Sequence, residues 1–429
     1  MIRLFLLLFT LLLSNCSFNE SNRLWKDKET EIQPNIKKLF EENKIITTEF
    51  NQDLKLDITK VKTNNLIVDN KNNFGIKDYS GIFKKIGGYK FSKFDDVNQL
   101  DFKPIFLNDG LIFFDKKGSV IRYDKNQKIL WKSNHYKKSE KKLKPKLKFF
   151  LDGTNLIVAD SIAKYYSIDI ISGKLNWSKN NTYPFNSEIK KYKNKIFVID
   201  YSNSLRCFNI NDGTECWNLQ TEKSFTMSGS KFSLIVIDNT VVFNNSIGDI
   251  TAVDIESGLM KWQLPTQSNN ILNNTYNFKI SKLVSDGNSI FFSNNKNEFY
   301  SINVKTGTIN WINEINSNLT PIINDNLLFT VSNNGFLYVV DKNRGNILRI
   351  TDLYTNDKIK KRKTIEPIGF AIGNSNLYLT NSDGKLIIVD LSHGNVARVE
   401  KISGGLVSVP FIFNKNLFVI KNGSIIQYN

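Results

Sequence analysis

One pattern of apolar and polar positions recurs from about residue 104 to the end of the sequence. A typical copy has an apolar run, a turn, a second apolar run that ends in Asp or Asn, then a Gly and a third run that closes on Trp. The clearest copy runs from Asp254 through Gly258 to Trp262. Repeats of about 40 to 50 residues built from short strands are typical of a β-propeller. The repeated Asp or Asn occurs at Asp124, Asp169, Asn209, Asp254, Asn303, Asp341, Asp390 and Asn429, which predicts an all-β, eight-bladed β-propeller.

Each position of the repeat has a physical reason. The Asp or Asn side chain can bond its own backbone and start a turn, and the Gly supplies a positive φ that closes it. The apolar runs are continuous because neighbouring blades cover both faces of each sheet. The Trp is large enough to wedge between adjacent blades, where an indole buries roughly 150–250 Å². We assign this blade-packing role to Trp131, Trp177, Trp217, Trp262 and Trp311.

Two copies have Arg where Trp is expected. Arg349 and Arg398 stand at this position in the sixth and seventh repeats. A long Arg side chain can cover apolar surface with its stem while its charged head stays in water. We therefore expect both guanidinium groups to be solvated.

The eighth repeat ends one strand short of a full blade. Propellers remove exposed sheet edges by pairing the first and last segments of the ring. We expect an N-terminal strand to pair with the C-terminal blade, with candidates at 45–58 and 65–76. Blade one would then begin near 81–94, residues 45–76 would close the ring, and 81–429 would form sequential blades. The propeller domain would span residues 45–429.

The N-terminus has the pattern of an export signal. Arg3 precedes an apolar run of about ten residues, which is too short to cross a bilayer and suits a signal-peptide core. Residues 1–15 are therefore predicted to be a signal peptide. The sequence up to Cys16 resembles the lipobox of bacterial lipoproteins, which implies lipidation of Cys16. Ser17 follows, which by that family's rule favours the periplasmic face of the outer membrane, and 16–44 reads as the lipidated Cys and a flexible tether.

The composition argues against several kinds of metal site and leaves open the role of two lysine-rich stretches. With only two His and three Cys, a His-based metal site or a zinc site with four Cys ligands is not expected. The formal net charge is +17, and lysines concentrate in two stretches, 137–148 and 358–363. These stretches are either solvated loops or contacts for anionic headgroups or an acidic partner. Nucleic acid is disfavoured because the chain is exported and its aromatic residues occupy core positions of the repeat.

Cys207 and Cys216 both fall in the third repeat. Pairing Asn209 with Thr214 across the turn places Cys207 opposite Cys216. Directly opposed residues of antiparallel strands lie within disulfide range, and export makes oxidation plausible. We expect a Cys207–Cys216 disulfide; the alternative is two separate, reduced cysteines.

The repeat of Asp254 to Trp262 resembles the quinoprotein-type (PQQ-repeat) β-propeller family over about residues 81–429. Together with the lipoprotein signal, the short tether and the eight blades, it looks like the BamB family of outer-membrane barrel-assembly lipoproteins. That resemblance implies a non-catalytic scaffold without cofactor or metal, a monomer within a larger complex. Its implied partners are the periplasmic repeats of the assembly pore and unfolded barrel precursors.

The resemblance also suggests a partner-binding loop at 263–278, with Ile271, Leu272, Tyr276 and Phe278 as apolar anchors. A flexible linker with a partly buried apolar pair is the alternative for this segment. For the whole chain, a periplasmic ligand-binding or sensor propeller, or a peptidoglycan-facing adhesin, stays open. A PQQ-dependent dehydrogenase is less favoured, because the chain has no vicinal Cys pair, no long lid insertion and no carboxylate cluster.

Overall fold

The computed structural model describes residues 48–58, 76–93, 102–222, 232–266 and 278–429, which belong to one compact unit, residues 45–429. The predicted signal peptide (1–15), Cys16 and the tether (16–44) lie outside the described residues. So do Ile271, Leu272 and Tyr276. Among the described residues, no helix has the length and apolar character needed to cross a membrane.

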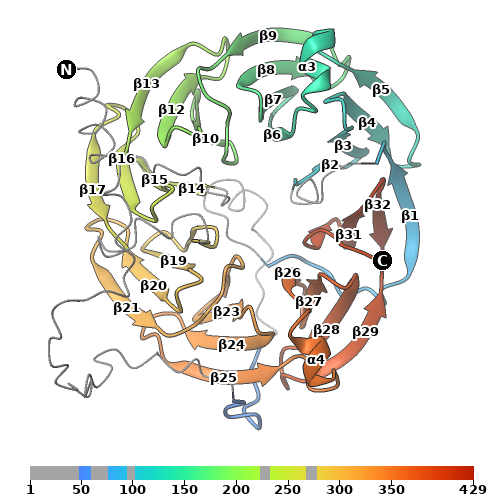
Figure 1. The fold of residues 1–429 in the computed structure, drawn as a ribbon, viewed down its shortest axis with the longest axis vertical. Coiled ribbons are helices and arrows are strands. Elements are labelled where there is room, and N and C mark those ends of the chain that lie inside the picture. Colours follow the sequence, from blue (N-terminus) through green and yellow to red (C-terminus); the bar gives the residue numbers. More distant parts are fainter. Residues whose placement is uncertain (1–47, 59–75, 94–101, 223–231, 267–277) are drawn as a thin grey trace, which may run out of the picture. The chain divides into compact units, whose positions relative to one another are not determined.

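Eight four-stranded antiparallel sheets surround a central axis, which confirms the predicted eight-bladed all-β propeller (Figure 1). Within each blade the strands are hydrogen-bonded in order from the axis outward. Blade one contains β2 (Ile105–Leu107), β3 (Gly110–Phe114), β4 (Val120–Asp124) and β5 (Ile129–Ser133), and blade two contains β6 (Leu147–Asp152), β7 (Asn155–Asp160), β8 (Lys164–Asp169) and β9 (Leu175–Asn180). Blade three contains β10 (Lys190–Tyr192), β11 (Lys195–Ile199), β12 (Ser204–Asn209) and β13 (Glu215–Gln220), and blade four contains β14 (Leu234–Ile237), β15 (Thr240–Asn244), β16 (Ile250–Asp254) and β17 (Met260–Leu264).

The remaining blades follow the same order, and two short helices, α3 (Lys138–Lys142) and α4 (Ile359–Arg362), lie in connections between blades. Blade five contains β18 (Val284–Ser285), β19 (Ser289–Ser293), β20 (Phe299–Asn303) and β21 (Ile309–Asn313), and blade six contains β22 (Ile322–Asn324), β23 (Leu327–Val331), β24 (Phe336–Asp341) and β25 (Ile347–Asp352). Blade seven contains β26 (Pro367–Ile372), β27 (Asn376–Asn381), β28 (Lys385–Asp390) and β29 (Val396–Lys401), and blade eight contains β30 (Phe411–Phe413), β31 (Asn416–Lys421), β32 (Ser424–Tyr428) and β1 (Lys85–Lys90).

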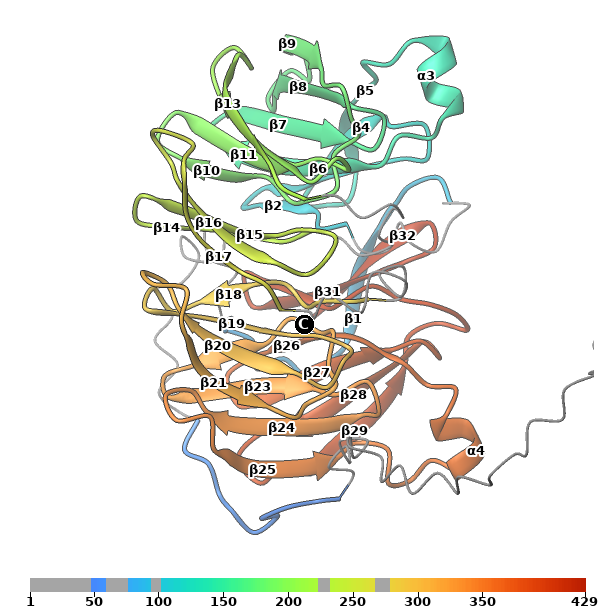
Figure 2. The ribbon, with the colours of Figure 1, turned by 60° about the vertical axis from the view of Figure 1, so that its left-hand side comes forward.

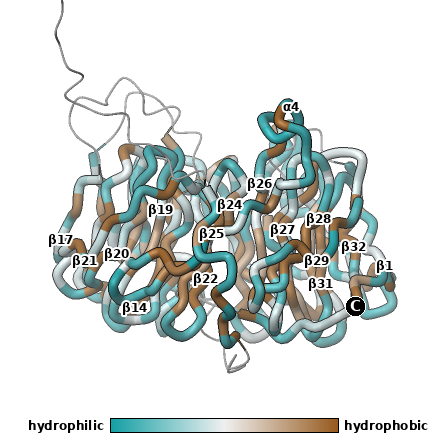
Figure 3. The backbone as a smooth tube through the Cα atoms, turned by 90° about the horizontal axis from the view of Figure 1, so that it is seen from below, coloured by the Kyte–Doolittle hydropathy of each residue, from teal (hydrophilic) through white to brown (hydrophobic). Residues whose placement is uncertain are grey.

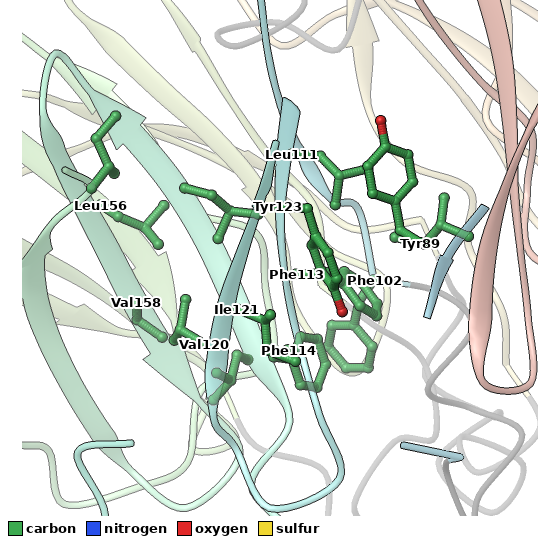
Figure 4. Packing of buried hydrophobic residues seen from close by; sticks show 14 of the residues in the cluster. Tyr89, Phe102, Leu111, Phe113, Phe114, Val120, Ile121, Tyr123, Leu156 and Val158 are labelled. Carbon is green, nitrogen blue, oxygen red and sulfur yellow. The ribbon is translucent and has the colours of Figure 1, made fainter. Parts of the chain in front are cut away.

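Burial along the strands follows from their place in the ring. The second strands, such as β3, are buried along almost their whole length, because a neighbouring blade covers each face. The outermost strands, such as β5, alternate between exposed and partly buried residues. The apolar clusters fill the seams between blades, and Figure 4 shows Val120 of blade one near Val158 of blade two.

The ring closes through an N-terminal strand, as predicted, but the strand is β1. It pairs antiparallel with β32, with Gly88 opposite Ile426. The described part of the candidate 45–58 does not pair with the C-terminal blade, and 81–94 does not begin blade one, which starts at β2. Residues 65–75 of the second candidate lie outside the described residues. β1 was missed because its sequence, KIGGYK, has two glycines and no apolar run. Just before it, the Phe83 ring stacks on Tyr428 with 4.1 Å between centroids.

Candidate interaction surfaces

The five tryptophans of the repeat connect blades one to six, each blade to the next, at the outer rim of the ring. Trp217 lies on the outermost strand of blade three, and its indole covers Gly258 in a turn of blade four. Its Nε1 also donates a hydrogen bond to the carbonyl of Ile255 in that turn, at 3.0 Å. The same contact with the next blade's glycine is made by Trp131 on Gly173, Trp177 on Gly213, Trp262 on Gly307 and Trp311 on Gly345.

Arg349 takes the tryptophan's place between blades six and seven. Contrary to our expectation, its guanidinium group is not solvated. The side chain is fully buried, and its guanidinium covers Gly394. It donates to the carbonyls of Leu391 and Ser392 in blade seven and of Leu54 in the N-terminal segment. Burial lowers the pKa of Arg349, and the Asp390 carboxylate opposes that change. The three carbonyls take the place of water at the two terminal nitrogens, whereas the buried Nε has no hydrogen-bond partner within the described residues.

Arg398, in contrast, is exposed as predicted. Its guanidinium forms an ion pair with Glu400 and donates to the carbonyl of Ile82 at 3.1 Å. The two arginines therefore occupy the same repeat position in different environments.

Residues 48–58, which we call the strap, lie on the outside of blade six. Phe50 forms an isolated antiparallel bridge with Ile350 of β25, through backbone bonds of 3.0 and 3.1 Å. The strap then reaches blade seven, where the Leu56 amide donates to the Ser392 carbonyl at 3.0 Å. Part of the segment predicted to close the ring therefore covers the seam between blades six and seven.

The cysteines lie near each other but not in the predicted register. A β-bulge between β12 and β13 places Cys207 opposite Trp217 and Phe208 opposite Glu215, so Cys216 is the extra residue of the bulge. Both cysteines are free, Cys207 buried and Cys216 exposed, so the predicted disulfide is absent from the structure. Burial raises the pKa of the Cys207 thiol, and the nearby Cys216 adds to this effect.

Of the predicted partner-binding anchors, the structure describes only Phe278. It is 2% exposed and packs against Gly248 in the core between blades four and five. Phe278 is therefore a core residue, and the prediction that it faces a partner was wrong. Near the start of the same loop, the Thr266 hydroxyl donates to the Gly248 carbonyl at 2.7 Å.

A cavity of about 460 Å³ lies among the innermost strands. Six phenylalanines line it, together with Lys77, Lys103, Lys148, Lys190, Lys282 and the carboxylate of Glu188. Burial raises the pKa of Glu188, but Lys282, Lys190 and Lys148 outweigh that effect and hold it well below its usual range. Sequence reasoning missed this cavity because its lysines are far apart in the chain and only the ring brings them together.

The lining can attract anions. Its one carboxylate, Glu188, already forms ion pairs with Lys282 and with Lys190, the latter at 3.7 Å. Within the described part of the chain, no group of three or more His, Cys, Asp or Glu side chains could hold a metal ion.

The sequence of the ring matches a known protein family. Residues 116–351, more than half of the chain, match the family described as outer membrane protein assembly factor BamB. The chain belongs to the BamB family. The crystal structure of BamB from Moraxella catarrhalis superposes with a TM-score of 0.65 at 16% identity, covering 81% of this chain and 100% of that chain.

Other similarities are less specific than this BamB match. Quinohemoprotein alcohol dehydrogenase from Comamonas testosteroni gives a TM-score of 0.63 at 10% identity, covering 86% of this chain and 82% of that chain. At such identities the structural likeness shows the propeller fold alone. Among curated proteins, botulinum neurotoxin type D from Clostridium botulinum D phage is 27% identical over 231 residues, 50% of this chain. The chain spans 17% of the length of that toxin, so the match carries no argument about activity.

Proposed function

We propose that this BamB-family chain is a non-catalytic scaffold subunit of the outer-membrane β-barrel assembly machinery. It binds the periplasmic repeats of the assembly pore and aids insertion of barrel precursors. The signal peptide at 1–15 directs export, and lipid on Cys16 anchors the chain to the periplasmic face of the outer membrane through the tether 16–44. The observation that carries the proposal is the family match across residues 116–351.

The arrangement of the described residues supports a scaffold. The strands are buried in the seams between blades, and the single carboxylate of the central cavity is engaged by lysines. The loop 263–278, with Ile271, Leu272 and Tyr276, is the proposed contact for the pore. With Phe278 placed in the core, these three side chains are the apolar anchors that remain in the proposal.

The test is a mild-detergent pull-down of the tagged, lipidated chain from its own membranes, with the co-purifying chains identified. We expect an outer-membrane barrel that carries periplasmic repeats. Ile271→Asp with Tyr276→Asp should abolish its recovery, whereas Asn273→Asp with Asn274→Asp, a matched change of charge in the same loop, should not. Recovery of no barrel from membranes that contain one would overturn the proposal.

A second candidate is a periplasmic propeller that binds a small anionic ligand, which the lysine-lined cavity favours. In that case the pull-down would recover no barrel. Small carboxylates would then raise the melting temperature of the chain, and Lys190→Ala with Lys282→Ala would remove that shift.

A further inference from the structure

The two lysine-rich stretches lie on the same face of the ring. α3 connects β5, the outermost strand of blade one, to β6, the innermost strand of blade two, and α4 connects β25 to β26 in the same way. Connections of this kind all leave the ring on one side, which we call the helix face. Figure 2 shows α3 and α4 projecting from the same side, and Figure 3 shows α4 standing above the ring. The turns with the repeated Asp and Gly lie on the opposite side, which we call the turn face.

Several carboxylates on the helix face are buried in the turns of the blades. In the turns between second and third strands, on the helix face, Asp115, Asp160 and Asp200 are at most 3% exposed. Asp115 and Asp200 form ion pairs with Lys132 and Arg206, at 2.7 and 2.8 Å. On the turn face, carboxylates such as those of Asp109, Asp212 and Glu256 are exposed, and Asp109 and Glu256 form ion pairs with Arg122 and Lys195. On the helix face, Glu222, Glu314 and Glu366 in the connections between blades are exposed as well.

Acidic side chains near the two helices are also engaged. Glu140 of α3 accepts a hydrogen bond from the Lys137 amide and pairs with Lys164 of blade two at 3.4 Å. At α4, Arg362 pairs with Asp352 at 2.8 Å. Lys361 of the same helix pairs with Asp357 and with Asp383, at 2.6 and 3.7 Å. These ion pairs fasten each helix to its blade and neutralise the carboxylates that they involve, whereas Glu366, which follows α4, is exposed.

Exposed lysines of the two connections surround an exposed apolar residue in each. Beside α3, Leu143 is 65% exposed, and Ile359 of α4 is 77% exposed. The exposed lysines around them are Lys137, Lys138 and Lys142 at α3, and Lys358, Lys360 and Lys363 at α4.

We propose that the helix face docks on an anionic lipid bilayer, with α3 and α4 as two contact points. The lysines bind headgroup phosphates, and Leu143 and Ile359 enter the boundary between headgroups and acyl chains. Basic residues near a surface with anionic lipids each add attraction, and apolar side chains beside them add burial. An apolar residue inside each lysine cluster suits this boundary better than the polar surface of an acidic protein. The proposal does not rest on the barrel-assembly function or on lipidation of Cys16.

The test measures binding of the full chain with Cys16→Ser, which removes the predicted lipid attachment point. Its partition onto phosphatidylcholine vesicles is compared with partition onto vesicles that also contain phosphatidylglycerol. The test variant carries Lys138→Glu, Lys142→Glu, Lys360→Glu and Lys363→Glu. The control carries four exposed turn-face lysines changed in the same way, Lys125→Glu, Lys128→Glu, Lys174→Glu and Lys305→Glu, so the net charge is identical.

We expect the chain with an unaltered helix face to bind anionic vesicles more tightly than phosphatidylcholine vesicles. The test variant should bind the anionic vesicles at least about tenfold more weakly, whereas the binding of the control variant should change little. Added salt should weaken the binding, because screening acts within about 10 Å at 0.1 M. Leu143→Ser with Ile359→Ser should reduce the binding that persists in salt. Absence of binding to anionic vesicles, or equal losses in test and control variants, would overturn the proposal. Capture of an acidic protein without vesicle binding would assign the face to that protein class instead.

Discussion

At the scale of single residues, the contact between tryptophan and glycine is the smallest unit that holds neighbouring blades together. Gly258 has a φ of +74°, and a Cβ added there would lie 2.7 Å from the Trp217 ring. Gly153 also has a positive φ, of +58°, but no atom lies within 4 Å of an added Cβ. The two positions therefore separate backbone strain from loss of packing between blades.

Gly258→Ala should consequently destabilise the ring more than Gly153→Ala. The left-handed backbone costs either variant about 1–2 kcal/mol. Displacing the Trp217 ring should cost Gly258→Ala about a further 1–3 kcal/mol. Urea unfolding of both variants measures the difference. Equal losses would mean that the indole moves away without cost and that the contact contributes little.

A second prediction at this scale concerns Asp160, which is buried beside Tyr136. Burial raises its pKa from 3.8 to about 6, and the hydrogen bond from Tyr136 opposes that change. Because the folded pKa is the higher one, the carboxyl contributes stability below about pH 4, and this contribution is lost as the pH rises through about 6. Asp160→Asn should lack this loss, so its unfolding free energy relative to wild type should rise by up to about 3 kcal/mol between about pH 4 and pH 7. Parallel pH profiles for the two chains in urea unfolding would contradict the raised pKa.

At the scale of elements, the repeat predicted most strands but not the exceptions to it. Trp217 and Gly258 could be placed because their spacing recurs. The bulge that separates Cys207 from Cys216 recurs at the same place in each of blades one to seven, but it could not be placed because no residue type marks the extra residue. The buried Arg349 head is bonded by the Leu54 carbonyl of the strap and by carbonyls of blade seven, all far away in the chain, so local sequence gave no sign of its burial.

Arg349→Trp tests whether this arginine holds the strap. Trp would restore the contact with the glycine of the next blade, but it cannot donate to the Leu54 carbonyl as Arg349 does. We expect faster hydrogen exchange at the amides of Phe50 and Leu56, measured by mass spectrometry, with the ring strands still protected. Arg398→Trp is the control, because Arg398 bonds Ile82 rather than the strap. Unchanged exchange in the Arg349 variant would show that backbone bonds alone hold the strap.

At the scale of the whole molecule, ring closure creates surfaces that no single repeat contains. The helix face unites α3 and α4, and the central cavity unites lysines from several blades. The spacing of the repeat predicts the ring but not these surfaces, since connecting loops and innermost strands do not share its pattern. The family match has the same limit, because it identifies the ring and leaves the surface that meets each partner to experiment.

The closing blade should therefore decide the stability of the whole ring, and a disulfide can test this. Ser424 of β32 is opposite Lys90 of β1 on one side and Lys421 of β31 on the other. In a chain with serine at the native cysteines, Lys90→Cys with Ser424→Cys joins the two ends of the ring, whereas Lys421→Cys with Ser424→Cys closes only a hairpin. From loop-closure entropy, the first disulfide should stabilise the folded state by about 4 kcal/mol more than the second. Guanidinium unfolding of the oxidised and reduced forms measures this difference. Equal stabilisation would mean that β1 and β32 stay associated after the other blades unfold, so the ring would not open at this seam.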